Sequence, residues 1–230
     1  MGPKSSQRAL VLAPHPDDES LGCGGTLKLI TSAGGCVDVL YMTRGENGAF
    51  PNTPLSPSHR EEIANRRKNE AMRACQVLGA RNVSFLGGID GRLQTQPQLA
   101  EPIVQALTSM EYRSVFCPWP YDAHTDHVAT YSLLYEALKR YPKNIDIWLY
   151  EVWTPLRHNI CISIDATIDA KLEAFRAHES QAAILDYADA FQGLARYRGL
   201  FCPPARFAEA FFNCDRAALL SHENIPWPKP

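Results

Sequence analysis

An apolar run passes directly into ionisable side chains in the segment Ala9-Leu-Val-Leu-Ala-Pro-His-Pro-Asp-Asp-Glu19. The apolar part, residues 9–13, is typical of a strand buried on both faces of a parallel sheet. In open parallel sheets the ligand crevice lies beyond the carboxyl ends of the strands. The segment therefore predicts a buried strand and indicates the edge of the sheet at which functional side chains should be sought.

Short apolar runs alternate with longer amphipathic stretches along the rest of the chain, which is typical of strands and helices around a buried parallel sheet. The expected strands are residues 9–13, 37–42, 83–86, 115–117, 147–151 and 161–164. The expected helices are residues 22–33, 59–79, 97–110, 126–140 and 167–190. We therefore expect an α/β fold: a Rossmann-like, mostly parallel sheet with helices on both faces and the active site at the carboxyl ends of the strands.

The chain has 230 residues, a length that fits one α/β domain with a substantial core. We see no internal repeat and no change of composition that would mark a linker. We therefore expect a single domain over residues 1–230. Residues 222–230 form a Pro-rich tail that cannot be regular structure.

Charge and hydropathy exclude several classes of protein. With 23 basic and 25 acidic side chains the net charge is -2, so no basic field attracts nucleic acid or anionic lipid. No run approaches the roughly 18 apolar residues of a membrane span, and residues 9–13 are too few for a signal peptide. The 7 cysteines are odd in number and suit reduced thiols. We expect a cytoplasmic protein with no nucleic-acid or membrane partner.

Polar and ionisable residues follow each of the first four expected strands. These segments are Pro14 to Glu19, Thr43 to Gly48, Gly87 to Gly91 and Asp122 to His127. Because the carboxyl ends of parallel strands lie along one edge of the sheet, four separate segments deliver functional groups to the same place. A purely structural protein has little reason for this arrangement.

Two motifs have the spacing of a metal site. His15 and Asp18 stand three residues apart, as do His124 and His127, so the side chains of each pair can converge on one ion. Imidazole and carboxylate are the ligand types of catalytic zinc, which keeps three protein ligands and one open position. With His15, Asp18 and His127 as the ligands, acid and base groups remain beside the metal. These remaining groups are Asp17, His124 and Asp126.

Each motif alone also has a plain structural explanation. Asp17, Asp18 and Ser20 are residue types that commonly cap a helix. An isolated His-x-x-His pair is often solvated on a helix surface. Both motifs follow strands of the same expected sheet, and this coincidence favours the metal site.

The segment around His15 resembles the opening motif of the PIG-L/LmbE-like family of N-acetylglucosaminyl deacetylases, with Ala13-Pro-His-Pro-Asp-Asp-Glu19 followed by Gly24-Gly-Thr-Leu27. Further motifs that resemble this family follow in the same order. They are Thr43-x-Gly-Glu-x-Gly48, Arg67-x-x-Glu-Ala71, Phe85-Leu-Gly87 with Asp90-Gly91, His124-x-Asp-His127 and His178-x-Ser-Gln181. The resemblance thus covers residues 9 to about 181, and its two histidine-aspartate motifs are highly specific together.

The resemblance implies a zinc-dependent enzyme that removes an N-acetyl or other N-acyl group from an amino sugar conjugate, releasing a carboxylate and a free amine. It implies one Zn²⁺ per chain, with His15, Asp18 and His127 as the metal ligands. Zinc supports such a reaction because it lowers the pKa of its water and polarises the amide carbonyl.

Five further roles follow from the resemblance. Asp17 is similar to the general base, and His124 to the group that stabilises the oxyanion and protonates the leaving amine. Asp126 is expected to orient a histidine. Arg67 and Asp90 resemble positions that hold sugar hydroxyls, although an Arg-Glu pair three residues apart is often a surface ion pair.

Two other classes of protein remain as alternatives. A nucleotide-binding oxidoreductase is disfavoured, because the glycines around Gly24 do not form a G-x-G-x-x-G pattern. A non-catalytic carbohydrate- or metal-binding module would be expected to lack a ligand or base, and none is missing. The sequence does not identify the N-acyl sugar that is bound or the role of His178. It also leaves the oligomeric state open, with a homo-oligomer as one option. Residues 46–60 form either a lid over the site or a plain surface loop.

Overall fold

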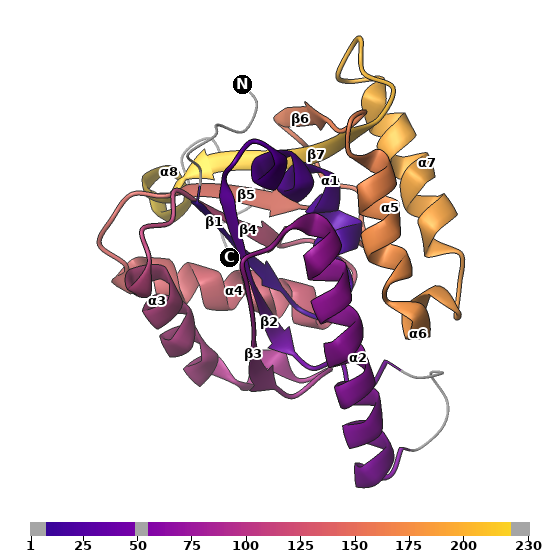
Figure 1. The fold of residues 1–230 in the computed structure, drawn as a ribbon. Helices are drawn as coiled ribbons and strands as arrows, with labels where there is room; N and C mark the ends of the chain where they lie inside the picture. Colours follow the sequence, from indigo (N-terminus) through magenta and orange to yellow (C-terminus); the bar gives the residue numbers. More distant parts are fainter. Residues whose placement is uncertain (1–7, 49–54, 222–230) are drawn as a thin grey trace.

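Seven strands form one sheet in the order β3-β2-β1-β4-β5-β7-β6 (Figure 1). This computed structural model describes residues 8–48 and 55–221, so the tail at 222–230 and part of the 46–60 segment lie outside the described residues. The strands are β1 (Arg8–Ala13), β2 (Cys36–Thr43), β3 (Asn82–Gly88), β4 (Ser114–Pro118), β5 (Asp146–Tyr150), β6 (Ile160–Ser163) and β7 (Ala208–Asp215). The first five pair in parallel, and β7 is antiparallel to both of its neighbours. The expected mostly parallel α/β sheet is confirmed.

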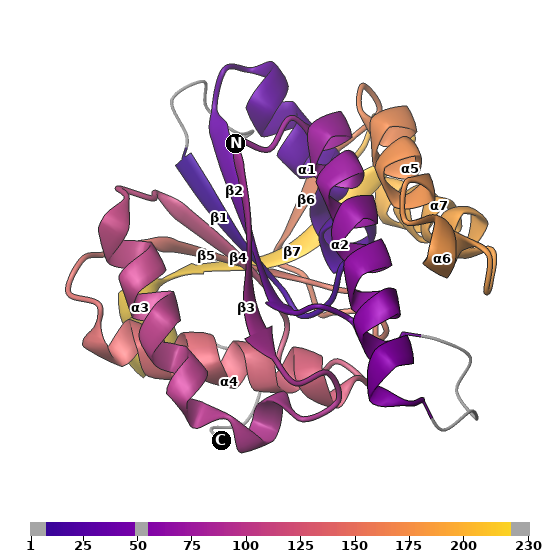
Figure 2. The same cartoon turned by 60° about the horizontal axis from the view of Figure 1, so that its bottom comes forward.

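Helices cover both faces of the sheet, as expected (Figure 2). One face carries α1 (Asp18–Ser32), α2 (Pro57–Leu78), α5 (Ile168–Arg176) and α7 (Tyr187–Gly199). The other face carries α3 (Ala100–Ser109), α4 (Thr125–Arg140) and α8 (Arg216–Ser221). Alternate residues of β1 point to the two sides, since Leu10 and Leu12 lie in one apolar core while Val11 lies in the other. Short helical turns complete the fold: η1 (Leu93–Thr95), η2 (Pro97–Leu99) and α6 (Glu179–Ala182).

Strand β6 matches the strand expected over residues 161–164, but the chain after it differs from the expected pattern. The helix expected over residues 167–190 is wrong, because this stretch holds α5, α6 and the start of α7. The chain leaves helical geometry at His178, whose side chain turns into the interior and is 0% exposed. The strand β7 was not expected, because it carries the acidic Glu209 inside an otherwise apolar run. Among residues 8–48 and 55–221, no helix combines the length and the apolar character that crossing a membrane requires.

A buried ion pair fixes the position of α1, the helix that begins at Asp18. The carboxylate of Glu209 accepts the main-chain N–H groups of Gly25 and Thr26 at 2.9 and 2.8 Å. Nζ of Lys171 donates to Glu209 and to the carbonyl of Leu21, both at 2.6 Å. Because removal of one partner leaves the other charge buried and unpaired, such a pair holds its neighbours firmly in one arrangement.

We predict that Gly25→Ala destabilises the protein whereas the adjacent Gly24→Ala does not. A methyl group on Gly25 would lie 2.8 Å from Cγ2 and 2.9 Å from Cβ of the buried Ile164, which is too close. The corresponding contacts of Gly24 begin at 3.5 Å. Overpacking costs about 1–3 kcal/mol, and alanine inside a helix gains about 0.5–1 kcal/mol over glycine. Urea unfolding of both variants measures the difference, and equal free energies of unfolding would contradict this packing.

Candidate metal centre and active site

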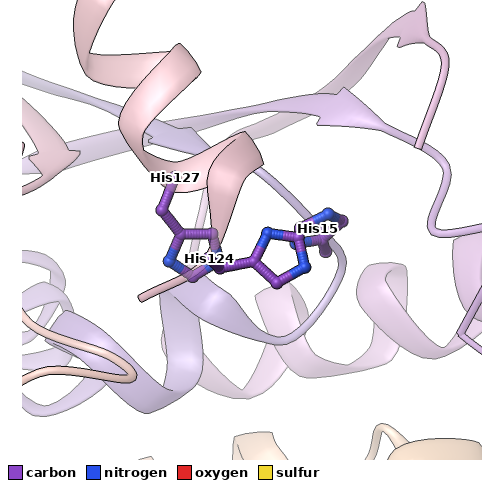
Figure 3. Close-up of side chains that lie close together, drawn as sticks. All are labelled: His15, His124 and His127. Carbon is purple, nitrogen blue, oxygen red and sulfur yellow. The ribbon is translucent and has the colours of Figure 1, made fainter. Parts of the chain in front are cut away.

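The connections of the sheet reverse direction between the neighbouring strands β1 and β4, since the chain continues from β1 to one side and from β4 to the other. In open α/β sheets the crevice beyond the carboxyl ends at such a point is the preferred ligand site. The turn after β1 carries His15, and the N-terminal end of α4 carries His124 and His127 (Figure 3). The topology therefore brings the two histidine motifs together.

The three imidazole rings form one cluster (Figure 3). Their centroids lie 4.7 Å apart for His15 and His124, 5.5 Å for His15 and His127, and 5.0 Å for His124 and His127. Oδ2 of Asp18 lies 3.2 Å from Nδ1 of His15 and 3.2 Å from Nε2 of His127. One nitrogen from each histidine lies within 4.8 Å of the others, so a single ion can contact all three. The structure thus places the predicted ligands His15, Asp18 and His127 together, with His124 beside them.

Two carboxylates lie near the other nitrogen of His15. Its Nε2 is 3.2 Å from Oδ2 of Asp126 and 3.2 Å from Oδ1 of Asp90, and these three residues form a second set with ligand atoms within 4.8 Å of one another. The Asp126 side chain is fully buried, and its oxygens accept the N–H groups of Gly91 and Leu93 at 2.6 and 3.0 Å. Asp126 therefore joins the loop after β3 to α4 and contacts a histidine, as the orienting role predicted for it requires.

Asp122 lies in the segment between β4 and α4 and contacts the histidine cluster. The sequence motifs did not predict a role for it. Its Oδ1 lies 3.2 Å from Nδ1 of His127 and accepts the main-chain N–H of His124 at 3.0 Å. A carboxylate behind a metal-binding histidine fixes the orientation of the ring and raises its basicity. The only signal for Asp122 in the sequence is its place at the start of the segment that ends at His127.

His127 provides a test of whether the site fits a metal. The residue is 0% exposed, and neither ring nitrogen makes a hydrogen bond with any described residue; its contacts with Asp18 and Asp122 are close but not aligned. A buried polar atom without a partner is costly. A divalent cation held by these imidazole and carboxylate groups would satisfy Nε2, so the donor set fits a metal such as zinc.

The site also favours positive charge. Burial alone would lower the pKa of His15, but the three carboxylates that it contacts raise this pKa well above its usual value. Burial likewise acts to lower the pKa of His127, and Asp18 foremost among its neighbours raises it to about 9. Burial would raise the pKa of Asp18, yet the two histidines hold it well below its usual range. The carboxylates thus stabilise cationic neighbours, as a cation site requires.

Asp17 has a backbone φ of 138°, which L-residues rarely adopt. It precedes α1, but its side chain makes no capping hydrogen bond within the described residues, so the capping explanation is wrong for Asp17. Its N–H donates to Oε2 of Glu19 at 3.1 Å, and Nη2 of Arg67 lies 3.2 Å from its carboxylate while donating to the carbonyl of Pro16 at 2.6 Å. Burial, partly opposed by Arg67, raises the pKa of Asp17 to about 6.

The motif at residues 178–181 contacts the residues that hold Asp17 in place. Nε2 of His178 lies 2.9 Å from Oε1 of Glu19, and both side chains are 0% exposed. Burial would raise the pKa of Glu19, but His178 holds it below its usual value. His178, whose role the sequence left open, therefore contacts the carboxylate that holds the N–H of Asp17. The motif's other contacts run from Ser180 to Glu70 at 2.6 Å and from Gln181 to the carbonyl of Gly48 at 2.9 Å.

A cavity of about 290 Å³ lies over this cluster. The predicted site residues that line it are His15, Asp17, Asp18, Arg67, Asp90 and His124. The buried Asp126 and His127 lie behind this lining. Trp153, in the segment after β5, and Tyr187, at the start of α7, also line the cavity. No motif marks these two aromatic residues in the sequence, since they reach the site only through the packing of the C-terminal third.

The fold and the site together define a metal-dependent α/β enzyme. The chain matches the family model described as PIG-L, GlcNAc-PI de-N-acetylase, over residues 10–138. It is 31% identical over 191 residues to a probable N-acetyl-alpha-D-glucosaminyl L-malate deacetylase 2 of Bacillus anthracis, which covers 78% of this chain and 84% of the relative. The chain belongs to the PIG-L family, which confirms the resemblance seen in its motifs.

Solved structures agree on the fold. N,N'-diacetylchitobiose deacetylase from Pyrococcus horikoshii aligns with a TM-score of 0.82 at 24% identity, covering 96% of this chain and 88% of that one. A 4-carboxy-2-hydroxymuconate hydratase from Pseudomonas putida also aligns, with a TM-score of 0.79 at 18% identity, covering 97% and 98%. The hydratase shows that this fold does not determine a single reaction, so activity has to be argued from the site.

We predict that His178→Ala lowers the free energy of unfolding by about 1–3 kcal/mol, because it removes the imidazole that contacts the buried Glu19 carboxylate at 2.9 Å. His59→Ala is the matched control, since His59 is exposed on α2. Chemical denaturation in the presence of a chelator measures both variants without a contribution from bound metal. Equal stability of the two variants would show that the His178–Glu19 contact carries little energy.

Proposed function

We propose that this protein hydrolyses the amide of an N-acylated amino sugar conjugate, using one zinc ion held by His15, Asp18 and His127. The observation that carries the proposal is that Oδ2 of Asp18 lies 3.2 Å from a ring nitrogen of each of these two histidines, beside the strained and largely buried carboxylate of Asp17. The relative from Bacillus anthracis is named as a deacetylase, which supports an enzyme over a non-catalytic binding module.

The ligand assignment rests on how each candidate is already engaged. Both oxygens of Asp126 accept main-chain N–H groups, and Asp90 accepts the N–H of Asn47 at 2.9 Å. Asp18 also accepts one main-chain N–H, that of His15 at 2.9 Å, through the oxygen that lies close to both histidines. His124 accepts the N–H of Asp126 through Nδ1. The buried nitrogens of His127 have no hydrogen-bond partner among the described residues. We therefore assign the metal to His15, Asp18 and His127, because the Asp18 carboxylate contacts both histidines. Asp126 is assigned the role of orienting His15.

The chain's own groups can serve each proton transfer of amide hydrolysis. When bound, zinc supplies Lewis-acid polarisation of the amide carbonyl. Asp17 accepts the proton of the attacking water, and a pKa of about 6 keeps it a carboxylate at neutral pH while leaving it a stronger base than an exposed aspartate.

We assign to His124 the stabilisation of the negative charge that develops on the carbonyl oxygen during hydrolysis. Burial and the neighbouring His15 and His127 lower the pKa of His124. Because Nδ1 accepts the N–H of Asp126, Nε2 carries the proton of the neutral ring and can donate a hydrogen bond to the oxyanion. The leaving amine takes up the proton that Asp17 accepted from the attacking water, so the ring of His124 keeps its own proton.

Arg67 and Asp90 remain our candidates for contacts with sugar hydroxyls, since both line the cavity. The relatives act, by their names, on an N-acetylglucosaminyl malate and on N,N'-diacetylchitobiose. A cytoplasmic location, a homo-oligomeric state and a lid function of residues 46–60 are further proposals; Asn47 and Gly48, from the described part of that segment, line the cavity. Assays of N-acylated amino sugars for amine release, with zinc present, test the proposed activity directly.

We predict that the purified protein carries close to one equivalent of divalent metal and that chelation abolishes turnover, with zinc restoring it. The reason is that the donor set is that of a catalytic zinc site with three protein ligands. Metal analysis and an amine-release assay on the same sample provide the measurement. Full turnover by metal-free protein would refute the mechanism, and retained metal in a His15→Ala, His127→Ala double variant would refute the ligand assignment.

We predict opposite effects for two adjacent substitutions of the same residue type. Asp17→Asn should retain the metal and lose at least about 100-fold in turnover, because a positioned general base contributes roughly 10²–10⁴. Asp18→Asn should instead weaken metal binding, because an amide oxygen is a neutral and poorer ligand than a carboxylate. Metal content and turnover are measured for both variants.

The two variants control each other. If Asp17→Asn emptied the site while Asp18→Asn stayed loaded and slow, the two roles would have to be exchanged. If both variants turned over at the normal rate, neither aspartate would take part in hydrolysis.

A further inference from the structure

The cavity has an aromatic wall, which we define as Trp153 and Tyr187. Their rings meet nearly at right angles, 78°, with centroids 5.6 Å apart. Trp153 is 45% exposed although it lines the cavity, which is unusual for so large an apolar side chain. An exposed indole beside a polar reaction site is a ready surface for a ligand with an apolar face.

The aromatic wall is fixed relative to the candidate metal centre. The main-chain N–H of Trp153 donates to Oδ2 of Asp122 at 2.9 Å, while the other oxygen of Asp122 contacts His127 at 3.2 Å. Tyr187 packs edge to face against the buried Phe175, with ring centroids 5.9 Å apart. A ligand that lies on this wall is therefore held in a defined position relative to the reacting groups.

The cavity offers little to an anionic substituent. Its lining contains the carboxylates of Asp17, Asp18 and Asp90, and among the described lining residues Arg67 supplies the one guanidinium or ammonium group. The Arg67 side chain is 4% exposed, and its two terminal nitrogens donate to the carbonyls of Gly45 and Pro16 and contact Asp17. Apart from the histidines of the candidate metal centre, the described part of the lining therefore leaves no cation to pair with a phosphate or carboxylate of a ligand.

We propose that the cavity selects an uncharged amino sugar unit, whose pyranose ring lies with its apolar C–H face on the aromatic wall, and that it disfavours conjugates with an anionic group next to that ring. This inference rests on the proposed function and names its substrate class. A volume of about 290 Å³ is at the small end of ligand sites, so it suits one sugar ring with the remainder of the conjugate outside. The three carboxylates of the lining repel an anion, which adds discrimination to the attraction of the wall.

The first test compares ligands on the zinc-loaded, full-length protein. The neutral probes are methyl N-acetylglucosaminide and N,N'-diacetylchitobiose, and the anionic probes are N-acetylglucosamine 6-phosphate and the L-malate glycoside of N-acetylglucosamine. We expect kcat/KM and the affinity measured by calorimetry to be at least about tenfold higher for the neutral probes, which corresponds to about 1.4 kcal/mol. Equal values, or preference for an anionic probe, would overturn the selection of uncharged sugars.

The second test uses variants of the aromatic wall. Trp153→Ala should raise KM and the calorimetric Kd for the neutral probe by about tenfold, with kcat and zinc content nearly unchanged. Trp153→Phe should restore most of the affinity because it keeps an aromatic face. Tyr197→Ala is the matched control, since Tyr197 is an aromatic residue of α7 that is 52% exposed and is not part of the cavity lining. A normal KM and Kd for Trp153→Ala would refute the proposal that the sugar ring lies on the aromatic wall.

Turnover and binding separate the two proposals. Neutral sugar that binds in a Trp153-dependent way without being hydrolysed would refute the proposed function and leave the aromatic wall standing. Hydrolysis that does not change on substitution of Trp153 would refute the aromatic wall and leave the proposed function standing. Neither binding nor turnover of the neutral probes by zinc-loaded protein would refute both.

Discussion

The site depends on holding Asp17 in the strained turn between β1 and α1. A φ of 138° is sparsely populated for an L-residue, and such conformations cost of order 1–3 kcal/mol and persist only where surrounding contacts enforce them. Here Glu19 holds the main-chain N–H, and Arg67 holds the carboxylate and the carbonyl before it. Because this turn is fixed, the imidazole before it and the carboxylate after it face the histidines of α4.

The five parallel strands and the functional edge of the sheet could be predicted, because buried parallel strands are continuous apolar runs and polar residues begin where they end. The helices and the strand that follow β6 could not. Strand β7 places Glu209 in the interior, which is tolerated because its carboxylate accepts two N–H groups of α1 and pairs with Lys171. The expected helix over 167–190 breaks because His178 turns inward to a buried carboxylate. Both features depend on partners far away in the chain, which a local pattern does not contain.

The residues of the candidate site also fall into those that the sequence predicted and those that it did not. Residue types and spacing were enough to gather His15, Asp18 and His127, because each lies in a short motif at a strand end. The residues that orient or surround them, such as Asp122 and Trp153, are ordinary residue types whose importance lies only in a contact. The grouping of the candidate metal ligands is therefore predictable from motifs here, whereas the residues that surround them are not. The shared fold of a deacetylase and a hydratase makes the same point from outside this chain.

The carboxylate of Asp122 connects the candidate metal centre with the surface that we assign to the substrate. One oxygen contacts the ring of His127 and accepts the N–H of His124, and the other accepts the N–H of Trp153. Since the contact to Trp153 is made by its main chain, the indole itself takes no part in holding the metal centre. The side chain at position 153 can therefore change without moving the histidines, whereas the position of its backbone cannot. A site built in this way can change the sugar that it accepts by substitutions in the segment after β5 and keep its chemistry intact.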